Sequence, residues 1–144
     1  MRRDNRLPRV LHALLHIEQT IHPITSEMMG QMLGMDASQV RRTMAGLRKV
    51  GIVGSTKGHG GGWHLNKPLN EISLHEVYEA LGSPTLFALG QADDEPNCKL
   101  ERAANNATQN ALRAAQKSFD EQLLNVSVAD LIGFQITKIK LDNL

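Results

Sequence analysis

The segment Lys57-Gly58-His59-Gly60-Gly61-Gly62-Trp63 places four glycines within five consecutive positions. Glycine adopts positive φ without steric cost, so such a run lets a hairpin tip turn tightly and bring its backbone against another molecule. A short apolar stretch begins at Ile52-Val53, a second one covers Trp63-His64-Leu65, and Pro68 ends the second. The segment therefore predicts two short strands joined by a basic, glycine-rich tip.

Glycine runs also occur in two kinds of phosphate-binding loop. A phosphate loop needs Gly-Lys-Ser/Thr at the start of a helix, whereas Ser55-Thr56-Lys57 precede these glycines. A dinucleotide fingerprint also needs a helix after its glycines, so that the helix N-terminus faces the pyrophosphate. A strand follows here instead. Alone, the run would predict a glycine hairpin without a ligand, but the segments before it favour a binding role.

Three amphipathic segments precede the hairpin and predict helices at about residues 5–21, 26–33 and 37–49. Thr25 and Asp36 are the predicted N-caps of the second and third helices, and Pro23 ends the first. Gly34 makes the turn between the second and third helices, which predicts a helix-turn-helix. The positions expected to face the core are Leu7, Val10, Leu11, Leu14, Ile17, Ile21, Met28, Met29, Met32, Leu33, Val40, Met44 and Leu47.

A helix-turn-helix followed by a basic hairpin is how a winged helix meets double-stranded DNA. Arginine and glutamine can bond guanine and adenine edges with two hydrogen bonds. The candidate base-contacting residues on the third helix are Ser38, Gln39, Arg41, Arg42 and Thr43. The candidate phosphate and minor-groove contacts are Arg48, Lys49, Lys57 and His59, and additional backbone contacts are expected from Arg2, Arg3, Arg6 and Arg9.

Charge is distributed unevenly along the 144 residues. Residues 1–67 carry ten Lys or Arg and four Asp or Glu, a net of +6, whereas residues 68–144 carry six and eleven, a net of −5. This uneven distribution suggests that the basic N-terminal half faces nucleic acid and that the acidic C-terminal half lies away from it. The alternative is that the charges are only solvated on helix surfaces. No apolar run approaches the roughly 20 residues of a membrane span. One cysteine and no secretory signal predict a reducing, cytoplasmic location.

The second half predicts a helix over about 74–82, a connector that is acidic at Asp93-Asp94-Glu95, and a long helix over about 97–125. Ser127 is expected to cap a last helix that contains Val128, Leu131, Ile132, Phe134 and Ile136. The long helix would span some 40 Å at about 1.5 Å per residue, which exceeds a domain of this size. Its small-residue seam is therefore predicted to meet a second subunit rather than to fold back. The candidate dimer-interface residues are Ala104, Ala107, Ala111, Ala115 and Phe119, flanked by Leu100 and Leu123.

The sequence thus predicts a mainly α fold with a small β wing. Residues 1–83 form a winged helix-turn-helix DNA-binding domain in this prediction. Residues 84–97 form a connector with a candidate sensor region, and residues 98–144 contain the dimerisation helix and a C-terminal helix.

These segments together resemble the Rrf2 family of bacterial transcription regulators. The resemblance rests on residues 47–53, on the glycine-rich run, and on Ile72-Ser73-Leu74-His75-Glu76-Val77-Tyr78-Glu79-Ala80-Leu81. The family commonly has Arg-Gly-Pro-Gly-Gly-Gly-Tyr in the wing, so Lys57, His59 and Trp63 are departures. The resemblance implies a winged-helix domain, a long dimerisation helix, and sequence-specific repression or activation.

Iron–sulfur members of that family carry three cysteines in the connector and the start of the long helix, whereas this chain has only Cys98. One thiolate per subunit does not supply that set, so no cofactor and no cluster is expected. The chain looks more like single-cysteine members linked to thiol-reactive signals, which makes Cys98 the candidate redox sensor. Cys98 is expected in the first turn of the long helix with Asn97 as N-cap, where thiolate is favoured. An inert free cysteine is the alternative.

His12 and His16 are four residues apart on the first helix, a spacing that can place two ligands on one metal. No Cys, Asp or Glu is suitably spaced nearby, so two histidines on a polar helix face are favoured and no metal site is predicted. A cluster held by mixed residues across a dimer is the remaining alternative.

The sequence predicts a homodimeric DNA-binding transcription regulator. It is expected to act as a repressor and to respond to oxidants or electrophiles through Cys98. No catalytic constellation is present, so an enzyme is not expected. One alternative is a winged helix used as a protein-interaction module without specific DNA binding. The other is a small thiol redox enzyme that uses Cys98 and would turn over.

Overall fold

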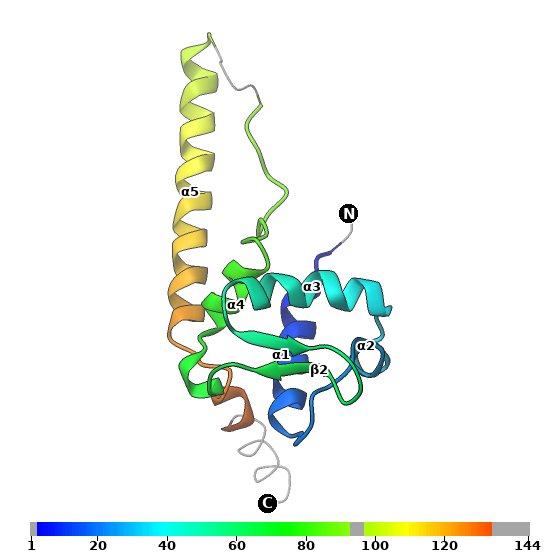
Figure 1. Cartoon of the computed structure of the whole chain (residues 1–144). Coiled ribbons are helices and arrows are strands. Elements are labelled where there is room, and N and C mark those ends of the chain that lie inside the picture. The colour runs from blue at the N-terminus through cyan, green and yellow to red at the C-terminus, as the bar shows by residue number, and fades with distance from the viewer. Residues whose placement is uncertain (1–2, 93–96, 134–144) are drawn as a thin grey trace, which may run out of the picture.

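A computed structural model describes residues 3–92 and 97–133 (Figure 1). The elements in chain order are α1 (Arg6–Glu18), α2 (Ser26–Leu33), α3 (Ala37–Lys49), β1 (Val53–Thr56), β2 (Gly62–Leu65), the 3-10 turn η1 (Leu69–Glu71), α4 (Leu74–Ala80) and α5 (Lys99–Leu124). The mainly helical fold with a small antiparallel wing is confirmed. The predictions made for Arg2, for Asp93-Asp94-Glu95, and for Phe134 and Ile136 lie outside the described residues.

Polar caps set the starts of three helices. The Thr25 hydroxyl accepts a hydrogen bond from the Met28 N–H at 3.1 Å, and the Asp36 carboxylate accepts one from the Gln39 N–H at 2.8 Å. Ser73 caps α4 in the same way at 3.0 Å. Each bond satisfies a donor that the first helical turn leaves without an internal partner. Because α2 ends in left-handed backbone at Gly34, α3 starts after a short turn.

The first helix is shorter than predicted. It ends at Glu18, and Ile21 is 96% exposed instead of facing the core. The Thr20 hydroxyl and N–H both bond the Ile17 carbonyl, which closes the helix with a tight turn. Pro23 adds to this effect because the residue before a proline avoids helical backbone. The extension to residue 21 was therefore wrong.

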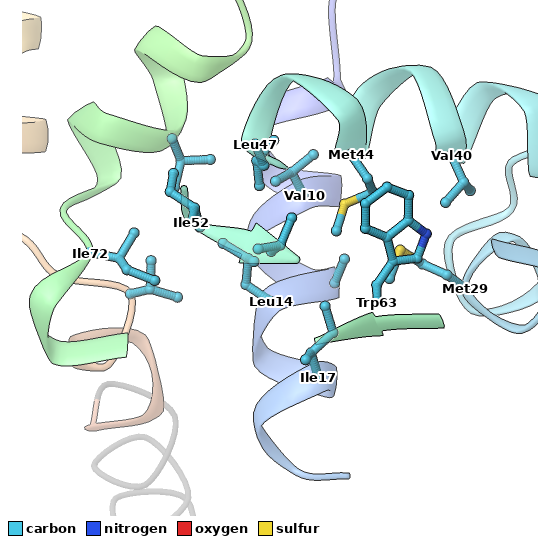
Figure 2. Packing of buried hydrophobic residues seen from close by; sticks show 14 of the residues in the cluster. Val10, Leu14, Ile17, Met29, Val40, Met44, Leu47, Ile52, Trp63 and Ile72 are labelled. Atoms are coloured by element: carbon cyan, nitrogen blue, oxygen red, sulfur yellow. The ribbon is translucent and has the colours of Figure 1, made fainter. Parts of the chain in front are cut away.

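The core lies between α1, α3, α4 and the wing, where Leu14, Met44 and Leu47 are fully buried (Figure 2). Trp63 reaches into it from β2, and its indole N–H donates to Ser26 at 3.0 Å. The predicted burial of Met28 and Met32 is wrong, since they are 54% and 38% exposed. These two share one face of α2, whereas the core covers the neighbouring face, on which Met29 is fully buried.

The wing is a two-stranded antiparallel hairpin whose register pairs Val53 with Leu65 and Thr56 with Gly62. Its base is tied to the segment between α1 and α2, because Ile24 and Trp63 exchange backbone hydrogen bonds of 3.0 and 2.8 Å. A Cβ on Gly62 would lie 2.5 Å from the Ile24 carbonyl oxygen, so the close approach requires glycine there. The wing therefore has a fixed position relative to α2 and α3.

The long helix α5 extends beyond the winged-helix unit, with the preceding chain running beside it (Figure 1). The Ala92 N–H donates to the Asn105 side chain at 3.3 Å, which ties that chain to the helix. After α5 the chain returns to the winged-helix unit, where Val128 is fully buried and its N–H bonds the Ile72 carbonyl at 2.9 Å. The predicted cap at Ser127 is confirmed by its bond from the Asp130 N–H at 3.2 Å.

Candidate nucleic-acid interface

The outer side of α3 carries the residues that the sequence assigned to base contacts. Ser38, Arg41 and Arg42 are exposed, while Gln39 and Thr43 are half-buried. The Ser38 hydroxyl donates to Asp36, and Arg41 pairs with Glu27 of α2 at 3.4 Å. Both charged groups of that pair are more than half exposed, so the pair contributes little and Arg41 can exchange it for another anion.

Arg48 connects the end of α3 to the wing. Its guanidinium donates to the Ser55 hydroxyl of β1 at 3.0 Å and lies 5.7 Å from the centre of the Trp63 ring. Arginine suits this position because its planar group can stack and donate at the same time. The sequence assigned Arg48 to phosphate binding and did not reveal this bridging contact, since the contact depends on how the wing folds back over α3. Lys49 is exposed beside it.

A hollow of 230 Å³ lies between α3 and the wing. It is lined by Ser26, Arg41, Arg48, Ser55, Thr56, Lys57, Gly62 and Trp63. Three of these side chains are cationic, three are hydroxyls and none is acidic. Cations and hydroxyl donors are the groups that contact phosphate oxygens in protein–DNA interfaces. Side chains from α2, α3 and the wing, which are separate segments of the sequence, thus line one hollow.

The tip of the wing presents Lys57 and His59 to solvent, and both are exposed. Positive φ values of 89° at Gly58 and 77° at Gly60 produce the tight turn that the sequence predicted. The N-terminal residues approach the same surface from the other end of α3. Arg3, Asp4, Asn5 and Arg6 line a second hollow together with Gln39. Asp4 pairs with Arg6 at 2.7 Å in this second hollow, so among the described residues Arg3 is the cation there without an acidic partner.

Cys98 is the N-cap residue of α5 and is exposed. The helix begins one residue later than predicted, so Asn97 precedes the cap rather than forming it. The Cys98 side chain makes no capping hydrogen bond of good geometry, yet the N–H groups of Glu101 and Leu100 lie close enough to lower the pKa of its thiol. A lowered pKa increases the thiolate fraction, which is the nucleophilic form.

The predicted seam of α5 divides between two faces. Its first four members, Leu100, Ala104, Ala107 and Ala111, are exposed, and so are Ala103 and Ala114, which the predicted seam did not include. Ala115, Phe119 and Leu123 are half-buried instead, and the Phe119 ring packs edge-on against Tyr78 of α4 at 5.1 Å. Phe119 therefore contacts its own chain. We name the exposed set the outward stripe of α5.

A helix-turn-helix, a wing and a long helix follow one another in this chain, and one family of known proteins matches nearly its whole length. The Rrf2 family model, described as an iron-dependent transcriptional regulator, matches residues 3–133. The chain belongs to the Rrf2 family. As an Rrf2 protein it is a transcriptional regulator and not an enzyme.

Two Bacillus subtilis proteins illustrate the relationship. The chain is similar to the HTH-type transcriptional regulator YwnA, with 28% identity over 131 residues, which covers 90% of this chain and 96% of YwnA. It is 38% identical over 84 residues to the HTH-type transcriptional regulator YwgB, a match that spans only 54% of YwgB. Among solved structures, CymR, the global cysteine regulator of Bacillus subtilis, has the same fold. Its TM-score is 0.65 at 16% identity, with 93% of this Rrf2 chain and 98% of CymR covered.

The family description mentions iron, so we compare the metal-ligating side chains of this Rrf2 chain with those that an iron–sulfur cluster needs. An iron–sulfur cluster is typically held by four cysteine thiolates, and this chain has one. Within residues 3–92 and 97–133, no group of three or more His, Cys, Asp or Glu side chains could hold a metal ion. The described residues of one chain therefore do not fit a cysteine-ligated cluster. In the same part of the chain, no helix is both long and apolar enough to cross a membrane.

Proposed function

We propose that this Rrf2 protein is a homodimeric repressor that binds double-stranded DNA through α3 and the wing. The observation that supports the proposal is the hollow between them, whose lining includes Arg41, Arg48 and Lys57 and no acidic side chain; Glu27, which pairs with Arg41, lies outside that lining. In this proposal Ser38, Gln39, Arg41, Arg42 and Thr43 contact base edges in the major groove, while Arg48, Lys49, Lys57 and His59 contact phosphates or the minor groove.

The DNA-binding part is tested by selecting genomic fragments with the protein and measuring affinity for the selected site by fluorescence anisotropy. Replacing both Arg41 and Arg42 with alanine should weaken specific binding and flatten the base preference. Lys57→Ala should weaken binding to all sequences and reduce the salt slope by about one unit, because one phosphate contact is lost.

Lys117→Ala is the matched control, because it removes one exposed charge from α5. Its affinity and salt slope should equal those of the wild type. Unchanged affinity in both the α3 and the wing variants would contradict the interface. Binding to a protein partner without salt-sensitive DNA affinity would instead favour an interaction module.

In this proposal the protein binds DNA as a dimer of two identical chains, because two-fold DNA sites are usually read by two-fold symmetric proteins. The outward stripe of α5 supplies an apolar face of small residues that allows close approach of a second helix. In such a dimer the position of α5 sets the distance between the two α3 helices. A separation of one DNA turn, about 34 Å, tolerates little error.

The proposed signal is an oxidant or an electrophile that reacts at Cys98. Its exposed thiol has a lowered pKa at the start of α5, so modification would add bulk or charge where that helix begins. Operator binding by the wild type and by Cys98→Ser should be compared before and after treatment with a quinone or hypochlorite. Release from DNA should occur in the wild type alone. An equal response of both proteins would remove Cys98 from the mechanism.

A further inference from the structure

Two histidines on α1 bring the same ring atom, Nε2, into close contact. The Nε2 atoms of His12 and His16 are 2.8 Å apart, and their ring centres are 4.5 Å apart with a tilt of 51°. His12 is exposed and His16 is half-buried, so the pair opens to solvent. We propose that His12 and His16 chelate one divalent transition-metal ion with a tetragonal preference, Cu²⁺ or Ni²⁺.

Coordination geometry indicates which class of ion suits two nitrogens this close together. Imidazole nitrogens bind first-row metal ions at about 2.0 Å, so two ligands at a right angle are separated by about 2.8 Å and two tetrahedral ligands by about 3.3 Å. The 2.8 Å between the two Nε2 atoms is a hydrogen-bond contact in the metal-free pair, and two adjacent positions of a square-planar or octahedral ion need the same separation. Cu²⁺ and Ni²⁺ prefer those geometries, whereas Zn²⁺ prefers the tetrahedral one.

Spacing along the helix explains why the two rings converge. Residues four apart lie on neighbouring turns of the same face, so α1 positions both histidines before any ion binds. In the metal-free pair one ring donates its Nε2 proton to the other ring's Nε2. On chelation the donating ring carries its proton on Nδ1 instead, so a neutral pair loses no net proton when both Nε2 atoms bind the ion.

The pair is a two-ligand site. The described residues contain no group of three metal-ligating side chains, so water fills the remaining coordination positions. The sequence alone favoured separate surface histidines because a third ligand was lacking, and the convergence of the two Nε2 atoms is the observation that changes this interpretation. Since α1 packs against α2, α3, α4 and β2, an ion bound across one turn of α1 should stabilise the folded winged-helix unit.

The test is calorimetric titration of the full chain with CuCl₂ and with NiCl₂. All proteins carry Cys98→Ser, because a thiolate is itself a metal ligand. The variants are His12→Gln and His16→Gln, and the matched control is His22→Gln, which removes an exposed histidine outside the pair. We expect one ion per chain, tighter binding of Cu²⁺ than of Ni²⁺, and at least tenfold weaker binding in each pair variant.

Two further measurements separate chelation from nonspecific binding. Electron paramagnetic resonance of the Cu²⁺ form should show coupling to two imidazole nitrogens, reduced in each pair variant. Ni²⁺ should raise the melting temperature of the parent and of His22→Gln but not that of the pair variants, whose folding is checked by circular dichroism without metal. Binding that is equal in all four proteins, or absent at micromolar Cu²⁺, would overturn the site and leave only a hydrogen-bonded histidine pair.

Discussion

Arg48 illustrates how one side chain contributes both to the fold and to the proposed interface. It occupies the last turn of α3, bonds Ser55 and lies against the ring of Trp63. A phosphate held in the hollow would therefore meet a guanidinium whose orientation is already fixed. Fixing it in advance reduces the entropy lost when DNA binds.

The first prediction concerns this orientation. Arg48→Lys keeps the charge but loses the planar group that stacks and donates together. The free energy of unfolding should fall by at most about 1 kcal/mol, because the hydrogen bond to Ser55 is exposed and the ring contact is weak. Urea unfolding measures it, and Lys49→Arg is the control because it changes a neighbouring exposed cation. Equal stability of Arg48→Lys and the wild type would mean that the bridge contributes nothing.

The second prediction concerns Cys98. Because nearby backbone N–H groups lower the pKa of its thiol, the folded protein should form thiolate at lower pH than the unfolded chain. The rate of alkylation by iodoacetamide should therefore rise with pH to a midpoint that is lower in the native protein than in the same protein in urea. Coinciding midpoints would show that the helix start does not activate this thiol.

Residue types and spacing predicted which side chains face outward on α3, but not what those side chains contact. The helical period alone places Val40, Met44 and Leu47 inward, and they are buried. The contacts of Arg48 with Ser55 and Trp63 depend on how the wing folds over α3, which no local pattern contains. The same limit applies to the two histidines of α1, whose spacing was visible and whose convergence was not.

At the scale of elements, the apolar seam of α5 is exposed in its first part and packs against α4 in its last part. A step of four residues advances about 40° beyond one full turn of a helix with 3.6 residues per turn. Ala111, Ala115, Phe119 and Leu123 follow such steps, so the seam rotates from the outward stripe towards α4. The sequence pattern showed a continuous apolar seam, and only the packing of Phe119 on Tyr78 reveals where its exposed part ends.

The third prediction tests the crossing of α3 and α4. A Cβ on Gly46 would lie 2.6 Å from the backbone oxygen of Ala80, which has no flexible side chain to move aside. In an open helix Gly→Ala stabilises by about 0.5–1 kcal/mol. Here overpacking should exceed that gain, so Gly46→Ala should destabilise the protein by about 1–2 kcal/mol in urea unfolding.

Ala45→Gly is the matched variant, because it measures the propensity difference at the adjacent position of α3. It should destabilise by no more than about 1 kcal/mol. If Gly46→Ala were instead more stable than the wild type, the two helices would be further apart than the contact between Gly46 and Ala80 indicates.

At the scale of the whole molecule, the fold followed from the sequence because its local signals agree with one another. The predicted caps at Thr25 and Asp36, the glycine tip and the helical periods all indicate the same winged helix. The errors occur where a short-range pattern competes with packing, as at Ile21 beyond the end of α1 and at Met28 on the open face of α2. The domain limits and the second subunit stay predictions.

The last prediction tests that second subunit. Ala111 lies in the middle of the outward stripe and is exposed in the single chain, so Ala111→Arg should leave the monomer folded. In a dimer packed on this stripe the arginine would bury an unpaired charge at a close contact, at a cost of about 3 kcal/mol or more. The dissociation constant should rise roughly a hundredfold. Sedimentation equilibrium measures this, and Asn106→Arg on another exposed face is the control. A wild type that is monomeric at micromolar concentration, or equal dimers in both variants, would show that the stripe does not join two copies.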